Sequence, residues 1–256
     1  MFYFLFTAKI LVYNGQTEEI IDMSQEQKNS KYQVYNPIPI QATRGIFGTL
    51  VQGQPFMCGG IDYETRRHHV LKTFYHVGND DAGLGTMLCQ RFYGSCVELN
   101  SKSVWIVGGK TRNNTRWKDT HLETTEIIIK SSNDPLKHIQ GPNLPFTISH
   151  HAMIKYDDHR IFIIGGDQDG VITNQTWIVD QLDDFKITRG PSMIEKRSGF
   201  SCGSIILNGK YVILVAGGNG ERLGTTLKSV EILDPTSTKG WMKGNTELKI
   251  CSKIIL

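Results

Sequence analysis

Paired histidines and paired aspartates are the residues of this sequence whose chemistry could hold a metal ion or transfer a proton. The histidine pairs are His68-His69 and His150-His151. Neighbours in a strand point to opposite faces, so the two members of a pair cannot easily bind one ion. The acidic pairs Asp80-Asp81, Asp157-Asp158 and Asp183-Asp184 lie in predicted turns, where Asp side chains support the turn by hydrogen bonding. We therefore predict surface and turn roles for these residues.

The sequence also lacks the usual signatures of enzymes and cofactor sites. It contains no G-x-S-x-G, H-E-x-x-H, P-loop or dinucleotide fingerprint. The glycine-rich stretch 217–224, "GGNGERLG", leads from a strand into a loop, with no amphipathic helix to offer its N-terminus to phosphate. We expect a protein without catalytic, cofactor-binding or metal-binding residues.

The five cysteines are predicted to be thiols of the core. None forms a C-x-x-C pair, and their number is odd, so a disulfide framework or a zinc site is disfavoured. Four of them, Cys58, Cys96, Cys202 and Cys251, lie in apolar runs, whereas Cys89 does not. Buried cysteine behaves as a small apolar side chain.

Apolar runs that stop at a pair of glycines recur along the chain and define its organisation. The pairs are Gly59-Gly60, Gly108-Gly109, Gly165-Gly166 and Gly217-Gly218, at intervals of 49, 57 and 52 residues. A weaker copy in 9–19 has Asn14 in place of the first glycine. Glycine adopts positive φ without steric cost, so each pair lets a buried strand end in a sharp turn.

Each interval between glycine pairs carries about four strand-like segments and no sustained helical period. A polar loop follows each glycine pair, then a β-branched run such as 124–131, then a bend, then a further strand such as 199–207. One four-stranded sheet cannot bury both of its faces, so repeats of this length stack radially. The sequence therefore predicts an all-β propeller.

These units resemble the kelch repeat. The stretch 190–235 carries the resemblance best, through Pro191, Met193, Arg197, Tyr211 and Asp234-Pro235 around its glycine pair. The stretch 160–190 contributes Trp177, and the stretch 87–130 contributes Arg91. Arg44 fills the corresponding bend of the first unit, whereas the bend "TISHH" at 147–151 has no arginine. The resemblance implies a kelch-type β-propeller that spans nearly the whole chain.

We expect a single domain over 1–256 with about five visible blades. The units cover about 9–52, 55–99, 103–156, 160–207 and 211–256. Kelch propellers most often have six or seven blades, so the chain is either an incomplete six-bladed ring or a closed five-bladed one. Closure by a shared blade is suggested because the end, "CSKIIL" at 251–256, resembles "CGSIIL" at 202–207, and the start has the strand "AKILVY".

The resemblance implies a non-enzymatic, adaptor-like module that binds a protein or peptide partner. Arg44, Arg91 and Arg197 would lie near the channel mouth and donate charge-assisted hydrogen bonds to acidic segments of the partner. The other role open to them is to tie blades together through loop carbonyls. The loops 61–68, 110–121, 167–175 and 219–227 are a second candidate surface, because loops on a regular scaffold carry recognition. A galactose-oxidase-like copper enzyme and a fragment without independent function are the alternatives.

The net charge and the N-terminal segment limit which further classes of partner we expect. A formal charge of +3 with no basic stripe predicts no nucleic-acid binding. The apolar start is too short to span a membrane and has no basic flank, so we interpret it as a strand, with a clipped signal peptide as the alternative. The sequons at Asn113 and Asn174 permit glycosylation if the chain is secreted, although a cytoplasmic location is favoured.

Overall fold

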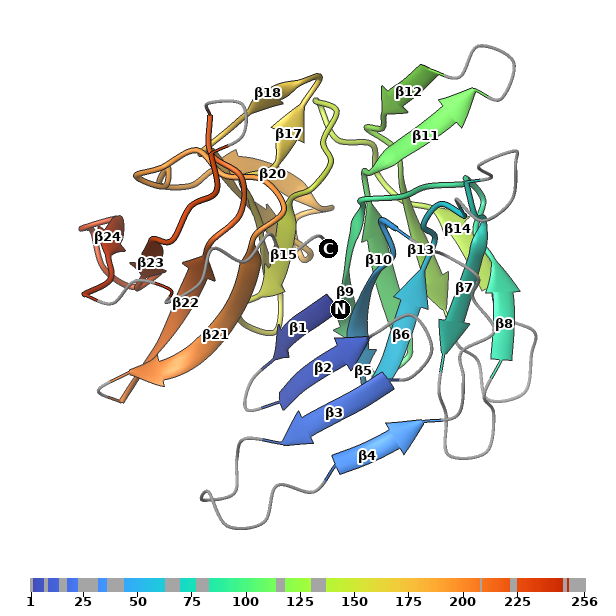
Figure 1. Cartoon of the computed structure of the whole chain (residues 1–256), viewed down its shortest axis with the longest axis horizontal. Helices are drawn as coiled ribbons and strands as arrows, with labels where there is room; N and C mark the ends of the chain where they lie inside the picture. The colour runs from blue at the N-terminus through green and yellow to red at the C-terminus, as the bar shows by residue number, and fades with distance from the viewer. Residues whose placement is uncertain are drawn as a thin grey trace. The chain divides into compact units, whose positions relative to one another are not determined.

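The computed structural model describes residues 44–248 except 63–69, 77–82, 114–117, 130–136, 208, 222–224 and 246–247, together with the backbone of four strands within residues 1–43 (Figure 1). Every regular element that it describes is a β-strand. The all-β prediction is therefore confirmed over the described residues. No helix long and apolar enough to cross a membrane occurs among them.

The strands form five four-stranded antiparallel sheets, each built from neighbouring segments of the chain. The first contains β1 (Phe2–Phe6), β2 (Lys9–Tyr13), β3 (Glu18–Asp22) and β4 (Tyr32–Tyr35). The second contains β5 (Phe47–Val51), β6 (Gln54–Cys58), β7 (Thr73–His76) and β8 (Gly83–Thr86). The apolar start is thus a strand, β1, as predicted.

Three further sheets follow. The third has β9 (Ser95–Asn100), β10 (Ser103–Val107), β13 (Thr125–Ile129) and β14 (Lys137–Gln140). The fourth has β15 (Ala152–Lys155), β16 (Arg160–Ile164), β19 (Thr176–Asp180) and β20 (Lys186–Arg189). The fifth has β21 (Ser201–Leu207), β22 (Lys210–Ala216), β23 (Val230–Leu233) and β24 (Trp241–Lys243). The four sheets from β5 to β24 are built alike, as the blades of a propeller.

Two small hairpins are inserted where the sequence suggested only loops. β11 (Lys110–Asn113) pairs with β12 (Lys118–His121), and β17 (Asp167–Gln168) pairs with β18 (Val171–Ile172). Each follows a glycine pair and connects the second and third strands of a blade. The hairpins therefore project from equivalent positions of two blades.

The strands that end in glycine pairs are the buried ones. All five residues of β10 are buried, and so are the last four of β16. A strand covered on both faces is apolar without alternation, which explains the runs that first revealed the repeat. Burying a large apolar side chain stabilises the fold by about 1.5–3 kcal/mol, so these strands contribute strongly.

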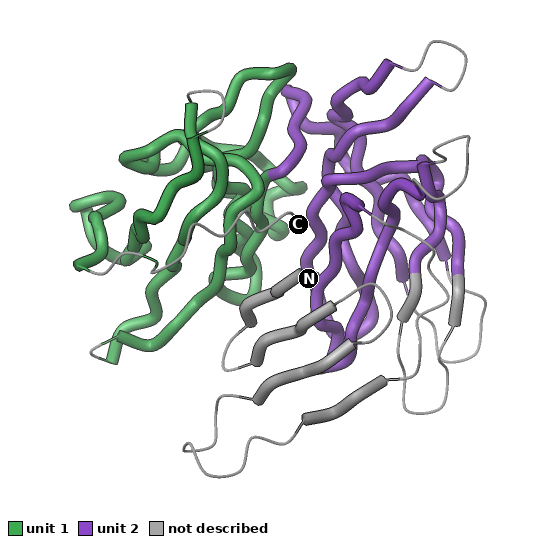
Figure 2. The backbone as a smooth tube through the Cα atoms, viewed as in Figure 1, with its two compact units in different colours: residues 1–37, 151–255 green, residues 38–150, 256 purple. Residues whose placement is uncertain are grey.

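The contacts divide the chain into two compact units, 1–37 with 151–255 and 38–150 with 256 (Figure 2). Within the second unit, β5 contacts β9, and Phe47, Phe74 and Ile106 belong to one core cluster. Within the first unit, β1 and β15 both contact β21. A separate core cluster there joins Phe162 and Phe200. In both units, first strands of different sheets thus lie side by side.

The first sheet contains four described strands, all from the N-terminal part of the chain. It takes all four strands from residues 2–35, and the segment 9–13 is its second strand because Phe2–Phe6 pairs with it. The predicted complementary segment 251–256 lies outside the described residues. The apolar start is a strand as predicted, whereas its pairing with 9–13 was not predicted.

Candidate functional site

A repeated hydrogen bond connects three of the four glycine pairs to the bend that precedes the next blade. The N–H of Gly60 donates to the carbonyl of Arg91 (2.9 Å), that of Gly109 to Ile148 (2.8 Å), and that of Gly166 to Arg197 (2.9 Å). The first glycine of each pair is equally constrained: Gly165 has φ +56°, and a Cβ there would lie 2.8 Å from the Arg197 carbonyl oxygen. Glycine is required because the two backbones approach so closely.

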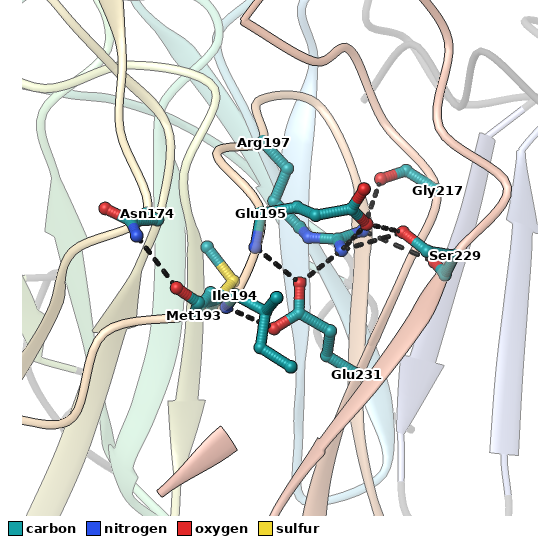
Figure 3. A network of polar contacts seen from close by, with 8 residues as sticks. All are labelled: Asn174, Met193, Ile194, Glu195, Arg197, Gly217, Ser229 and Glu231. Atoms are coloured by element: carbon teal, nitrogen blue, oxygen red, sulfur yellow. Dashed lines mark hydrogen bonds and ion pairs between the residues drawn. The ribbon is translucent and has the colours of Figure 1, made fainter. Parts of the chain in front are cut away.

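Arg197 is the centre of a buried polar network in the fifth sheet (Figure 3). Its Nη1 donates to the carbonyl oxygens of Gly217 (2.8 Å) and Ser229 (3.4 Å). Its Nη2 donates to Ser229 Oγ (3.1 Å) and to Glu231 Oε1 (2.6 Å). Neither Arg197 nor Glu231 exposes more than 1% of its side chain. An isolated charge would be costly at this depth, so the pair depends on its mutual bonds.

The Glu231 carboxylate also holds the bend in place. It accepts hydrogen bonds from the backbone N–H groups of Ile194 (2.6 Å) and Glu195 (3.0 Å), as Figure 3 shows. Glu195, which is partly exposed, accepts a hydrogen bond from the Ser229 hydroxyl. The network thus ties strand β23 to the bend before β21.

Arg91 repeats this arrangement in the second unit. Its Nη1 donates to the carbonyls of Gly108 (2.8 Å) and Thr124 (3.0 Å), and Glu126 accepts the N–H of Leu88 (2.6 Å). The ion pair is looser, with Arg91 Nε 3.7 Å from Glu126 Oε1. Burial raises the pKa of Glu126 and lowers the pKa of Arg91. Burial therefore disfavours the charged form of both partners.

The side chains of Arg91 and Arg197 are buried and bond to carbonyls of their own sheet, so neither faces a partner in this structure. The link to the preceding blade is made by their backbone carbonyls, which accept the N–H groups of Gly60 and Gly166. Arg44 is exposed, but it lies one residue later than expected. It pairs with Ile61 just as Phe92 pairs with Lys110, so it aligns with the residue after Arg91. The loose sequence pattern around Arg44 had concealed this offset.

The fourth sheet replaces both members of the charged pair. Ile148 occupies the arginine position and is fully buried. Trp177 occupies the glutamate position of this sheet. It pairs with Ile163 in the same way as Glu126 pairs with Ile106 and as Glu231 pairs with Val215. The missing arginine in "TISHH" is thus matched by a missing glutamate, which avoids an unpaired buried charge. Arg189 lies over the Trp177 ring, 6.0 Å from its centroid.

Two aromatic residues, Tyr93 and His150, occupy the bend position that follows the arginine position; the sequence singles out His150 as part of a histidine pair but does not single out Tyr93. Gly45, Tyr93, His150 and Gly199 are equivalent and have φ of +69°, +55°, +53° and +58°. The rings of Tyr93 and His150 stack with centroids 4.0 Å apart. The N–H of His150 donates to the Tyr93 carbonyl (2.9 Å), and Ser149 Oγ lies 3.0 Å from His150 Nδ1. An alignment of "RFYG" at 91–94 with "RSGF" at 197–200 would have revealed that Tyr93 takes the place of a glycine.

Of the remaining predicted residues, His151 is buried, so the surface role predicted for it is wrong. Asp157 accepts the backbone N–H groups of His159 and Arg160, the turn role predicted for it. Asp183 forms an ion pair with Lys186. The pairs His68-His69 and Asp80-Asp81 lie outside the described residues. No group of three or more His, Cys, Asp or Glu that could hold a metal occurs in the described part of the chain.

The two sequons differ in their surroundings. Asn113 is exposed at the end of β11. The amide of Asn174 donates to the carbonyl of Met193 (2.8 Å), so a glycan there requires this bond to be broken (Figure 3). Cys58 and Cys96 are buried free thiols, as predicted, whereas Cys251 lies outside the described residues.

The comparison with solved structures shows a β-propeller fold. The chain is similar to a protein whose structure is titled "Structure of YjhT", with a TM-score of 0.72 over 96% of this chain and 83% of that one. The two sequences are 12% identical. No protein-family model and no curated protein sequence matches the chain. Its likeness to a known protein is therefore one of fold.

Proposed function

We propose that this propeller is a non-enzymatic, kelch-type module that holds a protein or peptide partner through its blade loops. The observation that carries the proposal is the contrast between regular sheets and irregular insertions. After equivalent glycine pairs the chain inserts a hairpin at 110–121, a much shorter one at 167–172, and a loop at 219–227. Variable insertions on a repeated scaffold are typical of recognition surfaces.

The kelch type is supported by the repeated bend chemistry. A buried bend arginine bonds to the first glycine carbonyl in two sheets, and Met87 and Met193 are buried four residues before it. The contact of β1 with β21 supports a five-bladed ring. A monomer by light scattering that melts in one transition is expected for a closed ring. Concentration-dependent aggregation through open sheet edges would contradict five blades.

Photo-crosslinking tests the binding function. A photoreactive amino acid is placed at Thr120, Val171 or Thr225 on the insertions, and at Ile139 on outer strand β14 as the control. We expect crosslinks to a discrete protein partner from insertion positions, and none from Ile139. Labelling that is equal at all positions would contradict a loop-mediated interaction. Hydrogen peroxide formed from galactose by the copper-loaded chain would instead favour the copper-enzyme alternative.

A further inference from the structure

We propose that the hairpin β11–β12 and the Tyr93–His150 stack beside its base bind an extended, acidic peptide segment of the partner. This inference rests on the proposed binding function and specifies its surface and its ligand. The surface lies entirely within the unit 38–150.

The hairpin carries an excess of basic residues. Its two strands contain Lys110, Arg112 and Lys118 against one acidic residue, Asp119. Arg112 pairs with Asp119, so Lys110 and Lys118 supply the excess charge. By contrast, the equivalent hairpin β17–β18 carries Asp167 and Asp169 and no basic residue. An acidic ligand is thus complementary to one insertion and not to the other.

Backbone and side-chain bonds join the hairpin to the bend that carries Tyr93. Phe92 and Lys110 exchange both backbone hydrogen bonds (2.9 and 2.7 Å), and Gln90 Nε2 donates to the Arg112 carbonyl (3.3 Å). The Arg112 guanidinium, held by Asp119, lies 5.9 Å from the centroid of the Phe92 ring. The Phe92 ring in turn lies 5.1 Å from that of Tyr93. The cationic hairpin and the aromatic stack therefore form one surface.

At the stack, bulky residues hold a backbone conformation that the other equivalent bends give to glycine. Tyr93 and His150 adopt positive φ, which is unfavourable for bulky side chains, at a position where other bends have glycine. A Cβ on Gly45 would lie 3.2 Å from the Tyr93 ring, so this ring lies against Gly45 as well as His150. Strain retained at one place of a repeated scaffold points to a binding role. Stacked rings with a phenol and an imidazole provide both apolar area and polar contacts.

The form of the surface favours a peptide over a nucleic acid. The two-stranded sheet places β12, with three of its four residues exposed, at an edge that pairs with no other described strand. Such an edge accepts an extended segment by strand addition. A long polyanion would need basic residues spread along a stripe, whereas the two strands of this hairpin offer only a short basic segment.

Selection from a phage library of random 12-residue peptides tests the inference on the full chain. Enriched peptides are labelled with fluorescein and titrated by fluorescence polarisation. We expect them to be rich in Asp and Glu, and to lose about tenfold or more in affinity with the K110E/K118E variant. K137E makes the charge change of one of these two substitutions on β14 and should leave affinity unchanged, whereas K110E and K118E should each weaken binding on their own. Affinity should also fall as salt concentration rises.

The variants Y93G and H150G separate binding from folding. Because glycine accepts positive φ, both variants should melt close to the wild-type temperature while losing affinity for the selected peptides. Melting well below wild type with unchanged peptide affinity would indicate a structural role and overturn the inference. It would also fail if the peptides are not acidic, if K110E/K118E binds them as wild type does, or if a labelled 20-nucleotide oligothymidine binds the hairpin more tightly. Absence of any selected peptide would instead contradict the proposed function itself.

Discussion

Arg91 and Arg197 show at the scale of single residues how a charge is used inside a blade. Each bonds to the carbonyl of the first glycine of a pair, and each has a glutamate partner that also accepts backbone N–H groups of the bend. Where Ile148 takes the place of arginine, Trp177 takes the place of glutamate. Because arginine and glutamate are replaced together in this sheet, we infer that each buried charge requires the other.

Removal of Arg197 should therefore be more harmful than removal of both charges. R197M leaves Glu231 buried without its cation, and we expect a loss of about 3–5 kcal/mol in the free energy of unfolding. R197M/E231Q removes both charges and keeps an acceptor for the bend, so it should recover about 1 kcal/mol or more. Urea unfolding measures both.

Lys196 provides the control for this cycle. It pairs with Glu221 at the surface, so K196M should change stability by only about 0.5 kcal/mol. If the double variant is as unstable as R197M, the Arg197–Glu231 pair is not the source of the effect.

Asp234 gives a dependence on pH. The Thr236 hydroxyl (2.6 Å) and then the Lys210 ammonium (2.9 Å) lower the pKa of Asp234 from its ordinary 3.8 to about 2. Its contribution to stability is therefore present above the ordinary pKa and is lost as pH falls through about 2. T236V should raise the pKa of Asp234 towards 3.8, measured by carboxyl NMR titration. An unchanged pKa in this variant would show that the hydroxyl is not the cause.

At the scale of elements, the glycine pair is where the second strand of one blade meets the bend before the next. Its two residues have positive φ, and a backbone carbonyl oxygen lies within 3 Å of an added Cβ at Gly59, Gly109, Gly165 and Gly218. The insertions that follow the pairs are free to vary because they leave this junction unchanged. The same pair thus supports a basic hairpin in one blade and a short acidic one in another.

Alanine at two glycines separates this contact from conformational preference. G165A places a Cβ 2.8 Å from the Arg197 carbonyl, and we expect a loss of about 2–4 kcal/mol. Gly170 has φ +90° and no atom within 4 Å of an added Cβ, so G170A should cost only about 1 kcal/mol. Chemical denaturation compares the two. Equal losses would show that φ alone, and not the close approach, requires glycine.

At the scale of the whole molecule, the reactivities of the Cys58 and Cys202 thiols measure the unfolding of the two units separately. Cys58 lies in one unit and Cys202 in the other. Burial raises the pKa of the Cys58 thiol well above its ordinary value, and raises the pKa of Cys202 to about 12. Because the thiolate is the reactive form, neither should react readily in the native protein.

Alkylation by iodoacetamide at pH 8 should therefore modify Cys89, which is partly exposed, before the buried Cys58. Cys202 is also partly exposed, but its raised thiol pKa should make it slower to react than Cys89. With increasing urea, labelling of Cys58 and of Cys202 should begin as the respective unit unfolds, followed by peptide mass spectrometry. The unfolded chain, in which all three react, is the control. Native labelling of Cys58 as fast as Cys89 would contradict the packed core around it.

The repeat could be predicted from the sequence alone, because glycine pairs and apolar strands are patterns of residues that are neighbours along the chain. The all-β propeller, the buried strand before each pair and the bend arginines at positions 91 and 197 could all be recognised in this way. The strand Phe2–Phe6 was anticipated, but its pairing with β2 was not.

Only the tertiary structure decided what those residues do. An arginine at a bend can face solvent or the blade, and the position of Glu231 34 residues later makes it face the blade. Tyr93 and His150 are 57 residues apart, so their stacking depends on which bends lie side by side. The basic hairpin likewise becomes one surface with them only because Phe92 pairs with Lys110. Contacts between distant residues follow from packing, which a local pattern does not contain.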